Sequence, residues 1–340
     1  MKICIVGGGG AIGGFLAVQL ARAGNDVTVV ARGKTLDAIR EKGLTLITEE
    51  HPNGIQGPVR AVEKISEVGV MDVVILAIKA HQLTPIVDQI EQMVGQDTVI
   101  IPMQNGIPFW YFQRRPGLHQ DHVVETVDPN GTIMKTLDPH KIVGCVVYPA
   151  AISVSPGVIK HVEGIRFPIG ELDGATTERA QKISDMMTAA GFKSPILEDI
   201  RSEIWLKLWG NLTFNPISAL THGTLLEICQ HPRTRQLAKD MMTEAQEIAH
   251  QFNVTFRVTI DKRIDGAEKV GRHKTSMLQD VEAGRELEVD ALLGSVIELG
   301  QLVNVPTPRL EAVYALTTLL MDCIQDAKSG ISLVRPGNQH

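Results

Sequence analysis

A chain of 340 residues is longer than one hydrophobic core usually serves, so its length predicts two domains. Hydrophobic residues make up 44% of it and charged residues 21%, which excludes a disordered chain, a collagen-like repeat and a disulfide-stabilised miniprotein. The net charge is −6 and only 4% of the residues are aromatic, so the chain lacks the positive charge and the stacking rings on which nucleic-acid binders depend. We therefore expect no nucleic acid among its partners.

The cysteines and histidines do not form the patterns of a metal site. Cys4, Cys145, Cys229 and Cys323 are far apart, with no C-x-x-C pair, and none of the eleven histidines belongs to an H-E-x-x-H motif. We expect reduced thiols, no metal and a cytoplasmic location. The longest apolar runs, such as 73–78, are far shorter than the roughly 20 residues that cross a bilayer, so no membrane association is expected.

The first half of the chain alternates short apolar runs with stretches of helical periodicity. Continuous apolar runs are typical of strands buried on both faces, and helices between such strands imply right-handed crossovers and a parallel sheet. Strands are expected at 2–6, 26–31, 73–78 and 98–102, and helices at 11–23, 35–42 and 83–94.

The pattern changes twice further along. Between 142 and 171, glycines and prolines separate short apolar runs, which predicts antiparallel strands at one edge of the sheet. A helix is expected to follow at 175–191. Beyond residue 200 the strand signal nearly vanishes, and helices are expected at 201–219, 232–252, 287–303 and 309–327.

A glycine-rich turn joins the first expected strand to the first expected helix. The sequence G-G-G-A-I-G at 8–13 fits G-x-G-x-x-G with Gly8, Gly10 and Gly13, which lets backbone amides approach a pyrophosphate at a helix N-terminus. Such a turn can also serve tight packing alone, but the βαβ spacing around it favours dinucleotide binding. One extra residue precedes the motif, so its first glycine is either Gly7 or Gly8. We therefore expect a Rossmann-like α/β domain over 1–198 and a mostly α-helical substrate and catalytic domain over 199–340.

The end of the second expected strand indicates which cofactor is bound. NAD sites usually have Asp or Glu there to bind the ribose hydroxyls, whereas NADP sites have a cation for the 2′-phosphate. This chain has Arg32 and Lys34, with no carboxylate between 27 and 34, and Asp26 lies too early in the strand. Arg32 could be only a solvated side chain in a loop, but the pattern favours NADPH, with Arg32 and Lys34 as cofactor-binding residues.

Two polar loops follow the next two expected strands. Lys79 comes after 73–78 and Asn105 after 98–102, at the carboxyl ends where ligands bind in open α/β sheets. Lys79 could meet a phosphate or a carboxylate, and Asn105 the nicotinamide ribose, although Asn-Gly is also a common turn. We expect both residues at the cofactor site.

A polar stripe marks the first helix of the second half. Lys207, Asn211 and Asn215 fall at i, i+4 and i+8, so they share one helical face in a stretch otherwise rich in Trp, Leu and Ile. The face could be merely solvated, with Glu203 and Lys207 as an ion pair. Asn is, however, a poor helix former and costly to bury unpaired, so the stripe favours a small anionic or carbonyl ligand.

Two later segments hold polar residues whose role the sequence alone leaves open. Ser276 could be only a helix cap, and Glu288 only an exposed carboxylate in the first turn of a helix. With these segments the chain resembles the ketopantoate reductases (2-dehydropantoate 2-reductases) from about residue 1 to residue 325. The motifs that carry the resemblance are the glycine turn, K-A-x-Q at 79–82, N-G at 105–106, R-x-E-x-W-x-K at 201–207, N-x-x-x-N-P at 211–216, S-M-L-Q-D at 276–280 and E-x-D at 288–290.

The resemblance implies an enzyme that reduces a 2-oxo acid with NADPH, above all ketopantoate to pantoate in pantothenate biosynthesis. It implies Lys207 as the general acid and Glu288 as the carboxylate that orients the substrate. It implies Asn211, Asn215 and Ser276 as substrate ligands.

The same resemblance assigns Arg32 to the 2′-phosphate, and Lys79 and Asn105 to the nicotinamide end of the cofactor. The chain departs from the family pattern in the extra residue of the glycine turn and in His273, where members often have Asn. It also departs in 113–139, a segment rich in charge and histidine.

Two other functions stay open. One is a related NADP-dependent dehydrogenase that acts on another 2-hydroxy acid, such as a mandelate-like one. The other is a non-catalytic NADP-binding regulator, which would have no need of Lys207 together with Glu288. The composition permits a homodimer without requiring it.

Overall fold

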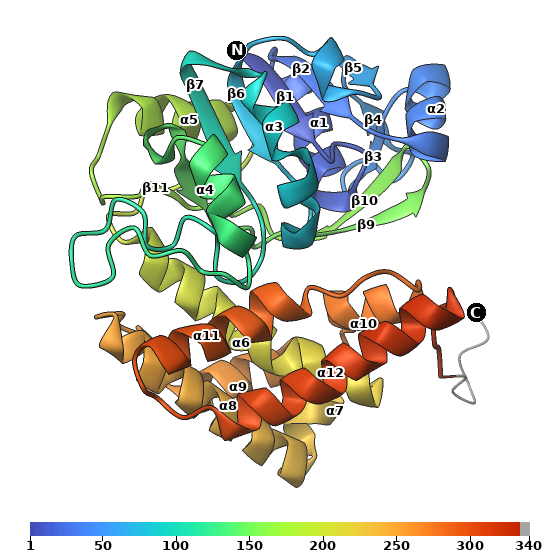
Figure 1. Cartoon of the computed structure of the whole chain (residues 1–340). Coiled ribbons are helices and arrows are strands. Elements are labelled where there is room, and N and C mark those ends of the chain that lie inside the picture. Colours follow the sequence, from blue (N-terminus) through green and yellow to red (C-terminus); the bar gives the residue numbers. More distant parts are fainter. Residues whose placement is uncertain (334–340) are drawn as a thin grey trace. The chain divides into compact units, whose positions relative to one another are not determined.

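The computed structural model describes residues 1–333, which separate into two compact units (Figure 1). The first comprises Met1–Val123 and Asp128–Ile200, and the second comprises Val124–Val127 and the chain from Arg201 onward, so the chain passes between the units three times. This division falls two residues later than the expected 198/199 boundary and gives Val124–Val127 to the helical part. Residues 334–340 of the expected second domain lie outside the described residues, and the roles expected of the two domains stay predictions.

A five-stranded parallel sheet forms the centre of the first unit. Its strands are β1 (Lys2–Val6), β2 (Asp26–Val30), β5 (Val59–Val62), β6 (Met71–Leu76) and β7 (Val94–Pro102), in the order β5-β2-β1-β6-β7. All four expected strands are present, whereas β5 was not expected. β1 lies in the middle of this sheet, with β2 and β5 added on one side and β6 and β7 on the other. In such a doubly wound sheet, ligands bind in the crevice at the carboxyl ends of the strands where the order reverses, here β1 and its neighbours.

The first helix, α1 (Ala11–Arg22), contacts two sheets at once. It packs on β1, β2 and β5 of the central sheet and on β3 (Thr45–Ile47), β9 (Ala150–Ser155) and β10 (Val158–Glu163) of a second sheet, whose order is β4-β3-β10-β9. Most of its residues are therefore buried, as expected of a helix with apolar side chains around its circumference.

Of the antiparallel strands expected at one edge of the central sheet, one pair lies in a different sheet and the other lies next to the edge strand β7. β9 and β10 form an antiparallel pair, but β10 pairs in parallel with β3, and β3 pairs with β4 (Ile55–Gln56). β8 (Val143–Cys145) and β11 (Ile169–Glu171) form a separate antiparallel pair, joined to β7 through one bridge between Ile100 and Ile142. The expectation was wrong for β9 and β10 because the strands at 45–56, which supply their partner, were not recognised.

The helix expected at 83–94 is broken into shorter pieces. The chain forms two 3-10 turns, η2 (Ala80–Gln82) and η3 (Thr84–Ile86), and only α3 (Val87–Glu91) is α-helical. Pro85 has no N–H to donate within a helix, and Ile86 leaves helical geometry with φ −121° and ψ 4°. The other helices of this unit are α2 (Gly33–Lys42), α4 (Thr132–Thr136) and α5 (Glu178–Ala189).

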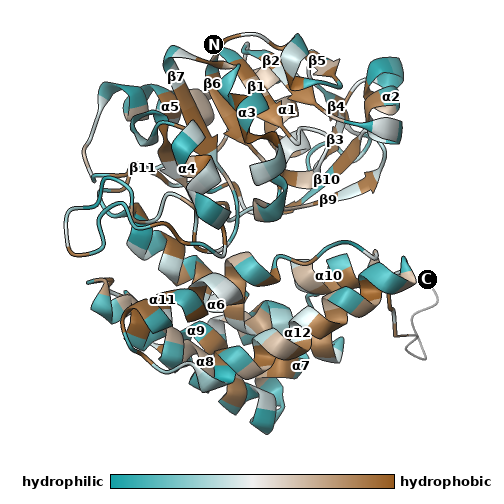
Figure 2. Ribbon diagram, in the orientation of Figure 1, coloured by the Kyte–Doolittle hydropathy of each residue, from teal (hydrophilic) through white to brown (hydrophobic). Residues whose placement is uncertain are grey.

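The second unit contains helices but no strand among its described residues, and most of its buried side chains are apolar. Figure 2 shows that hydrophobic and hydrophilic residues alternate along these helices. Its helices are α6 (Ile200–Thr221), α7 (Leu225–Gln230), α8 (Pro232–Gln251), α9 (Ile260–Lys269), α10 (Ser276–Glu282), α11 (Ser295–Leu302) and α12 (Pro308–Ala327). The sequence predicted α6, α8 and α12 closely and missed the shorter α7, α9 and α10. The helix expected at 287–303 begins with a π-helical turn, η6 (Asp290–Gly294), before α11.

The segment Val124–Val127 is held in the second unit by α11. The carboxylate of Glu298 accepts the backbone N–H of Glu125 at 2.7 Å and that of Thr126 at 2.8 Å, and it also accepts the Thr126 hydroxyl. The Val124 side chain is fully buried. This short segment lies within 113–139, the part of the chain that departs from the family pattern, and it gives part of that segment a structural role.

Candidate functional site

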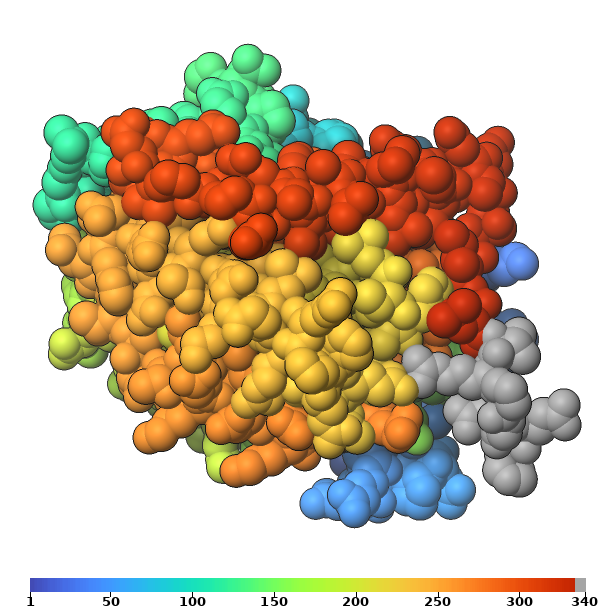
Figure 3. Space-filling view, turned by 90° about the horizontal axis from the view of Figure 1, so that it is seen from below, coloured from blue at the N-terminus to red at the C-terminus, as the bar shows by residue number. Residues whose placement is uncertain are grey.

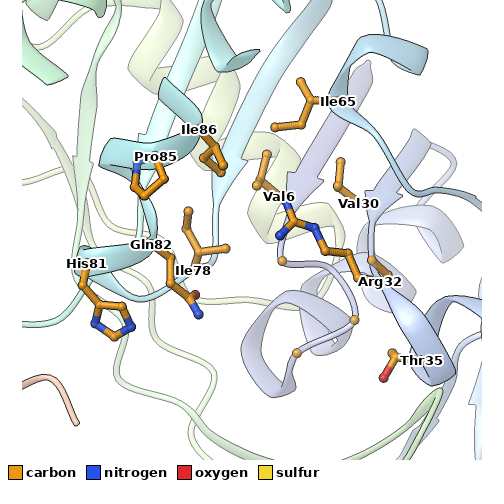
Figure 4. A pocket seen from close by; sticks show the side chains of 14 residues that line it. Val6, Val30, Arg32, Thr35, Ile65, Ile78, His81, Gln82, Pro85 and Ile86 are labelled. Carbon is orange, nitrogen blue, oxygen red and sulfur yellow. The ribbon is translucent and has the colours of Figure 1, made fainter. Parts of the chain in front are cut away.

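A pocket of about 550 Å³ opens at the carboxyl ends of β1, β2 and β6 (Figure 4). Four segments line it: the glycine turn after β1, the end of β2 with the first turn of α2, the turn after β5, and the loop after β6. Ligands of doubly wound sheets bind at this place. The lining residues are Val6, Gly7, Gly9, Gly10, Val30, Ala31, Arg32, Thr35, Ile65, Ile78, His81, Gln82, Pro85 and Ile86.

The glycine turn begins at Gly7, the first residue after β1. Gly7 has φ +85°, a conformation that side chains rarely allow, and its carbonyl accepts the N–H of Gly10 at 2.9 Å. A Cβ on Gly13 would lie 2.3 Å from that same carbonyl oxygen, so only glycine lets α1 approach the turn. Gly8 packs against β2 and does not line the pocket, whereas Gly9 and Gly10 do. Among the three expected glycines, Gly10 faces the pocket and the other two serve packing.

Arg32 lies at the pocket, and its guanidinium points into the opening in Figure 4. Its backbone is extended, at the N-cap position of α2. No carboxylate is found among the described lining residues. Asp26 is the first residue of β2, where its backbone pairs with that of Lys2 in β1, so it lies at the end of the strand away from the pocket. Lys34 is exposed on α2 and does not line the pocket, whereas Thr35, which the sequence did not single out, does.

The loop after β6 presents Gln82 and His81 to the pocket rather than Lys79. The Lys79 backbone N–H donates to Oε1 of Gln82 at 3.1 Å, which holds this side chain at the pocket edge (Figure 4) and leaves its NH₂ group as a donor. Lys79 itself is half-buried beside the pocket. Neither Gln82 nor His81 was predicted from the sequence to bind the cofactor, although Gln82 belongs to a family motif. Their approach to the glycine turn depends on the tertiary fold.

The loop after β7 is tied to the loop after β6 by Gln104. Its Nε2 donates to the carbonyls of Leu76 at 3.0 Å and Ile78 at 3.3 Å, while its Oε1 is buried with no partner in the described part of the chain. This link positions Asn105, which is half-buried and does not line the pocket. Gln104 gave no signal in the sequence.

In the second unit, two tryptophans fix the rotation of α6 about its axis. Trp205 and Trp209, one helical turn apart, are fully buried. The Trp209 Nε1 donates to the Met242 carbonyl at 2.7 Å, and its ring stacks on Phe256 with 3.9 Å between centroids. Helical periodicity puts Lys207 on the side of α6 opposite the tryptophans, where it is half-buried.

The polar stripe of α6 is more enclosed than a solvated face. Glu203, one turn before Lys207, is only 4% exposed, and its Oε2 lies 3.0 Å from Nη2 of Arg257. Asn211 is half-buried and Asn215 only 8% exposed. The interpretation of a merely solvated face is therefore wrong.

Asn215 and Asn211 place two amides one turn apart on the same face of α6 as Lys207. Asn215 is buried and Asn211 half-buried. An amide is costly to bury unless it is hydrogen-bonded, so amides at such positions are suited to bind a polar ligand. The two amides offer both donors and acceptors to a small polar molecule.

Ser276 and Glu288 lie on either side of the loop after α10. Thr275, not Ser276, is the cap of α10, because its side chain accepts the N–H of Leu278; Ser276 is exposed in the first turn. Glu288 is half-buried just before the π-helical turn η6, and its carbonyl accepts the Leu292 N–H at 3.2 Å. The interpretation of Ser276 as the helix cap is therefore wrong. Glu288 is half-buried, so it is less exposed than a fully solvated carboxylate would be. π-Helical turns are frequent at functional sites.

Neither a metal-binding cluster nor a membrane-spanning helix is found in the described part of the chain. No group of three or more His, Cys, Asp or Glu side chains in residues 1–333 could hold a metal ion. In the same part of the chain no helix has the length and apolar character needed to cross a membrane.

Comparison with known proteins matches both units to one family. The family described as "Ketopantoate reductase PanE/ApbA" matches residues 3–174, and its "C terminal" counterpart matches residues 199–320. A 2-dehydropantoate 2-reductase of Mesorhizobium japonicum is 50% identical over 321 residues, covering 94% of this chain and 98% of that protein.

Solved structures share the fold along nearly the whole chain. A crystal structure from Ralstonia solanacearum, provisionally assigned as a ketopantoate reductase, has a TM-score of 0.90 at 37% identity and covers 95% of this chain and 98% of that one. A D-mandelate dehydrogenase solved with NADH and anilino(oxo)acetate has a TM-score of 0.81, with 95% and 99% covered. At 21% identity this second likeness shows the fold alone.

Proposed function

This chain belongs to the ketopantoate reductase family, and from that membership we propose that it catalyses the NADPH-dependent reduction of 2-dehydropantoate to pantoate in pantothenate biosynthesis. The observation that carries the proposal is the 50% identity to a 2-dehydropantoate 2-reductase along 94% of the chain. A match of that extent includes both the residues of the pocket and those of α6.

The charge of the pocket supports NADPH as the cofactor. The lining residues include Arg32 and no carboxylate, so the pocket offers a cation to a 2′-phosphate and lacks the Asp or Glu that usually binds the ribose hydroxyls of NAD. The Gln82 NH₂ group and the turn at Gly9 and Gly10 fit the pyrophosphate, and the apolar side chains of Ile65 and Ile86 fit a base. When bound, NADPH supplies the hydride.

Lys207 is the proton donor in this proposal. Hydride addition to the carbonyl carbon of the 2-oxo acid leaves an alkoxide, and an ammonium group at Nζ of Lys207 can protonate it. Lys207 is half-buried on the face of α6 opposite the two tryptophans, a position that suits a residue of a ligand site. Glu288 would hold the substrate hydroxyl, and its negative charge would favour the protonated ammonium that a donor needs.

The remaining polar residues of the second unit would bind the substrate. Asn215 and Asn211 would hydrogen-bond it through their amides, and the exposed Ser276 would add a hydroxyl. These neutral groups orient a 2-oxo acid without neutralising its carboxylate. Lys79 and Asn105, beside the pocket, are assigned to the nicotinamide end, and Lys34 to the edge of the cofactor site. A cytoplasmic location and a homodimer complete the proposal.

The test is steady-state oxidation of NADPH with a panel of 2-oxo acids. The panel should contain 2-dehydropantoate, an aromatic 2-oxo acid that gives a mandelate-like product, and a short aliphatic one. We expect the highest kcat/KM with 2-dehydropantoate. A higher value with the aromatic acid would identify the chain as a related 2-hydroxy-acid dehydrogenase, and NADPH binding without turnover of any acid would identify a regulator.

A further inference from the structure

The π-helical turn η6 changes the direction in which Glu288 leaves the helix that follows it. The Ser295 N–H donates to the Asp290 carbonyl, five residues earlier, whereas an α-helix bonds residues four apart. An α-helix has 3.6 residues per turn, so one extra residue rotates everything before it by about 100° about the helix axis. Glu288 lies two residues before η6, and this rotation gives it a side of α11 that an unbroken α-helix would not.

Buried contacts fix η6 from within. Its residues 291–294 are all buried. Ser295, the next residue, is fully buried, and its hydroxyl donates to the Ala291 carbonyl at 2.8 Å. Because π-helical turns are rare and short, this one depends on such contacts to persist in place of a regular α-helical turn.

Tyr314 of α12 holds the same turn from outside. Figure 3 shows α12 (red) lying along the surface of the second unit, and α12 packs against η6. The Tyr314 hydroxyl donates to Oδ1 of Asp290 at 2.7 Å. The Tyr314 ring covers Gly294, where a Cβ would lie 3.2 Å from its Cε2 and 3.3 Å from its Oη. One side chain therefore contacts both the first and the last residue of η6, and the glycine gives its ring room to lie this close.

The Tyr314 hydroxyl remains a donor at neutral and mildly alkaline pH. Burial, followed by the hydrogen bond to Asp290 and the charge of that carboxylate, raises the pKa of Tyr314 to about 12. The proton that joins α12 to η6 is therefore kept. A hydrogen bond to a charged acceptor is among the stronger ones in a protein, so it can favour one form of a turn over another.

We propose that Tyr314 is a positioning residue, which keeps η6 in its π-helical form and thereby fixes the direction of Glu288 toward the substrate. The inference rests on the proposed function, which assigns Glu288 to the substrate hydroxyl. Tyr314 acts through Glu288 in this arrangement, and it does so by its contacts with Asp290 and Gly294. A contact that served only to pack α12 on η6 would instead affect the stability of the chain and leave substrate binding unchanged.

The first experiment separates these two roles by steady-state kinetics with the 2-oxo acid that gives the highest kcat/KM. Tyr314→Phe keeps the ring over Gly294 and removes the hydroxyl. We expect the KM of the 2-oxo acid to rise about tenfold, kcat to change by less than about threefold and the KM of NADPH to stay the same, because a group that orients the substrate is displaced. Thr317→Val is the matched control, since it removes another hydroxyl from α12, one that donates to the Val313 carbonyl within that helix. It should leave all three constants unchanged.

Replacing Asp290 separates the hydrogen bond from the ring contact. Asp290→Asn keeps an oxygen that can accept the Tyr314 hydroxyl, so it should keep the substrate KM near that of the parent chain, whereas Asp290→Leu should raise it as much as Tyr314→Phe does. Equal losses in the two Asp290 variants would overturn the role of the hydrogen bond. In Glu288→Ala, whose substrate KM should already be raised, Tyr314→Phe should add less than about twofold, because the two changes remove one and the same interaction.

Hydrogen exchange measures η6 itself, without any turnover. The backbone amide of Ser295, which closes the π-helical turn, should exchange with deuterium about tenfold faster in Tyr314→Phe than in the parent chain or in Thr317→Val. If the parent chain reduces a 2-oxo acid, an unchanged substrate KM in Tyr314→Phe, a rise that persists in full in Glu288→Ala or unchanged exchange at Ser295 would each overturn this inference alone. A parent chain that reduces no 2-oxo acid would overturn the proposed function, and the role of Tyr314 in substrate binding with it.

Discussion

Replacing Arg32 with alanine should separate the two nicotinamide cofactors. Arg32 is the cation among the lining residues of the pocket at the end of β2, and NADPH differs from NADH only in the 2′-phosphate. The variant should therefore bind NADPH more weakly and NADH almost as well as the parent chain. This outcome depends on the guanidinium touching the phosphate, because a residue that only shaped the loop would affect both cofactors.

The size of the effect follows from the exposure of Arg32. A charge-assisted hydrogen bond contributes roughly 1.5–3 kcal/mol where solvent is excluded. Arg32 is an exposed residue, so water and salt screen the contact and the lower end applies. A loss of about 1.5 kcal/mol corresponds to about a tenfold rise in the dissociation constant of NADPH. The loss should shrink as salt is added.

The assay is titration of both cofactors by calorimetry at low and high salt, for the parent chain, Arg32→Ala and Lys34→Ala. Lys34 is the matched control, since it is a cation two residues away that is exposed and does not line the pocket. We expect Lys34→Ala to change NADPH affinity less than Arg32→Ala does. Equal losses of NADPH and NADH in Arg32→Ala would refute the reasoning, and a larger effect of Lys34→Ala would transfer the phosphate contact to Lys34.

Four further outcomes are expected. Lys207→Ala should lower kcat by roughly 10²–10⁴-fold without changing NADPH affinity, and a few-fold change in turnover would remove Lys207 from the mechanism. Asn215→Leu should lower kcat/KM, because leucine cannot hydrogen-bond the substrate, while the free energy of unfolding should change by less than about 1 kcal/mol; a larger loss of stability would show that Asn215 is structural. Gly13→Ala should destabilise the chain by about 1–3 kcal/mol and weaken NADPH binding, because the new Cβ would meet the Gly7 carbonyl. Gly266→Ala, on α9 where a Cβ meets nothing, should stabilise the chain by about 0.5–1 kcal/mol, and urea unfolding measures both changes. Burial raises the pKa of the Cys4 thiol from 9.0 to about 12, so above pH 9 the unfolded chain loses a proton that the folded chain keeps. This group should therefore lower the free energy of unfolding by about 1 kcal/mol between pH 9 and 10, and Cys4→Ala should reduce that dependence on pH.

The parts of the fold that the sequence predicted are those in which local pattern and tertiary environment agree. The strand at 26–30 consists of β-branched residues after its first residue, and all of these are buried, so its composition alone identifies it. The stretch 83–94 has helical periodicity too, but Pro85 interrupts the backbone hydrogen bonds there. The strands at 45–56 are short and partly exposed, and only their pairing with β10 explains them.

The candidate site divides in the same way. Asn215 stood out because an amide in an apolar helix is unusual, and the structure shows it buried. Arg32 stood out through its position after a strand. Gln104 could not be found in this manner, because its contacts join the loop after β7 to the end of β6 and exist only in the folded chain. The place of Gln82 at the pocket likewise depends on how its loop approaches the glycine turn. The π-helical turn after Glu288 was also unpredictable, since its residues have the periodicity of an ordinary helix.

The hydrogen bonds between Glu298 and residues 125 and 126 limit how this chain can be divided into fragments that fold. A fragment that begins at residue 201 would contain every helix of the second unit yet lack Val124–Val127, and the carboxylate of Glu298 would lose all three of its donors at once. The buried place of Val124 would also be left empty. The helical unit is therefore not a contiguous module that could be expressed, exchanged between relatives or fused to another protein at a single junction. Any graft of it needs two breaks in the donor sequence, and a library of family chimaeras should lose foldable members wherever a crossover separates residues 124–127 from Glu298.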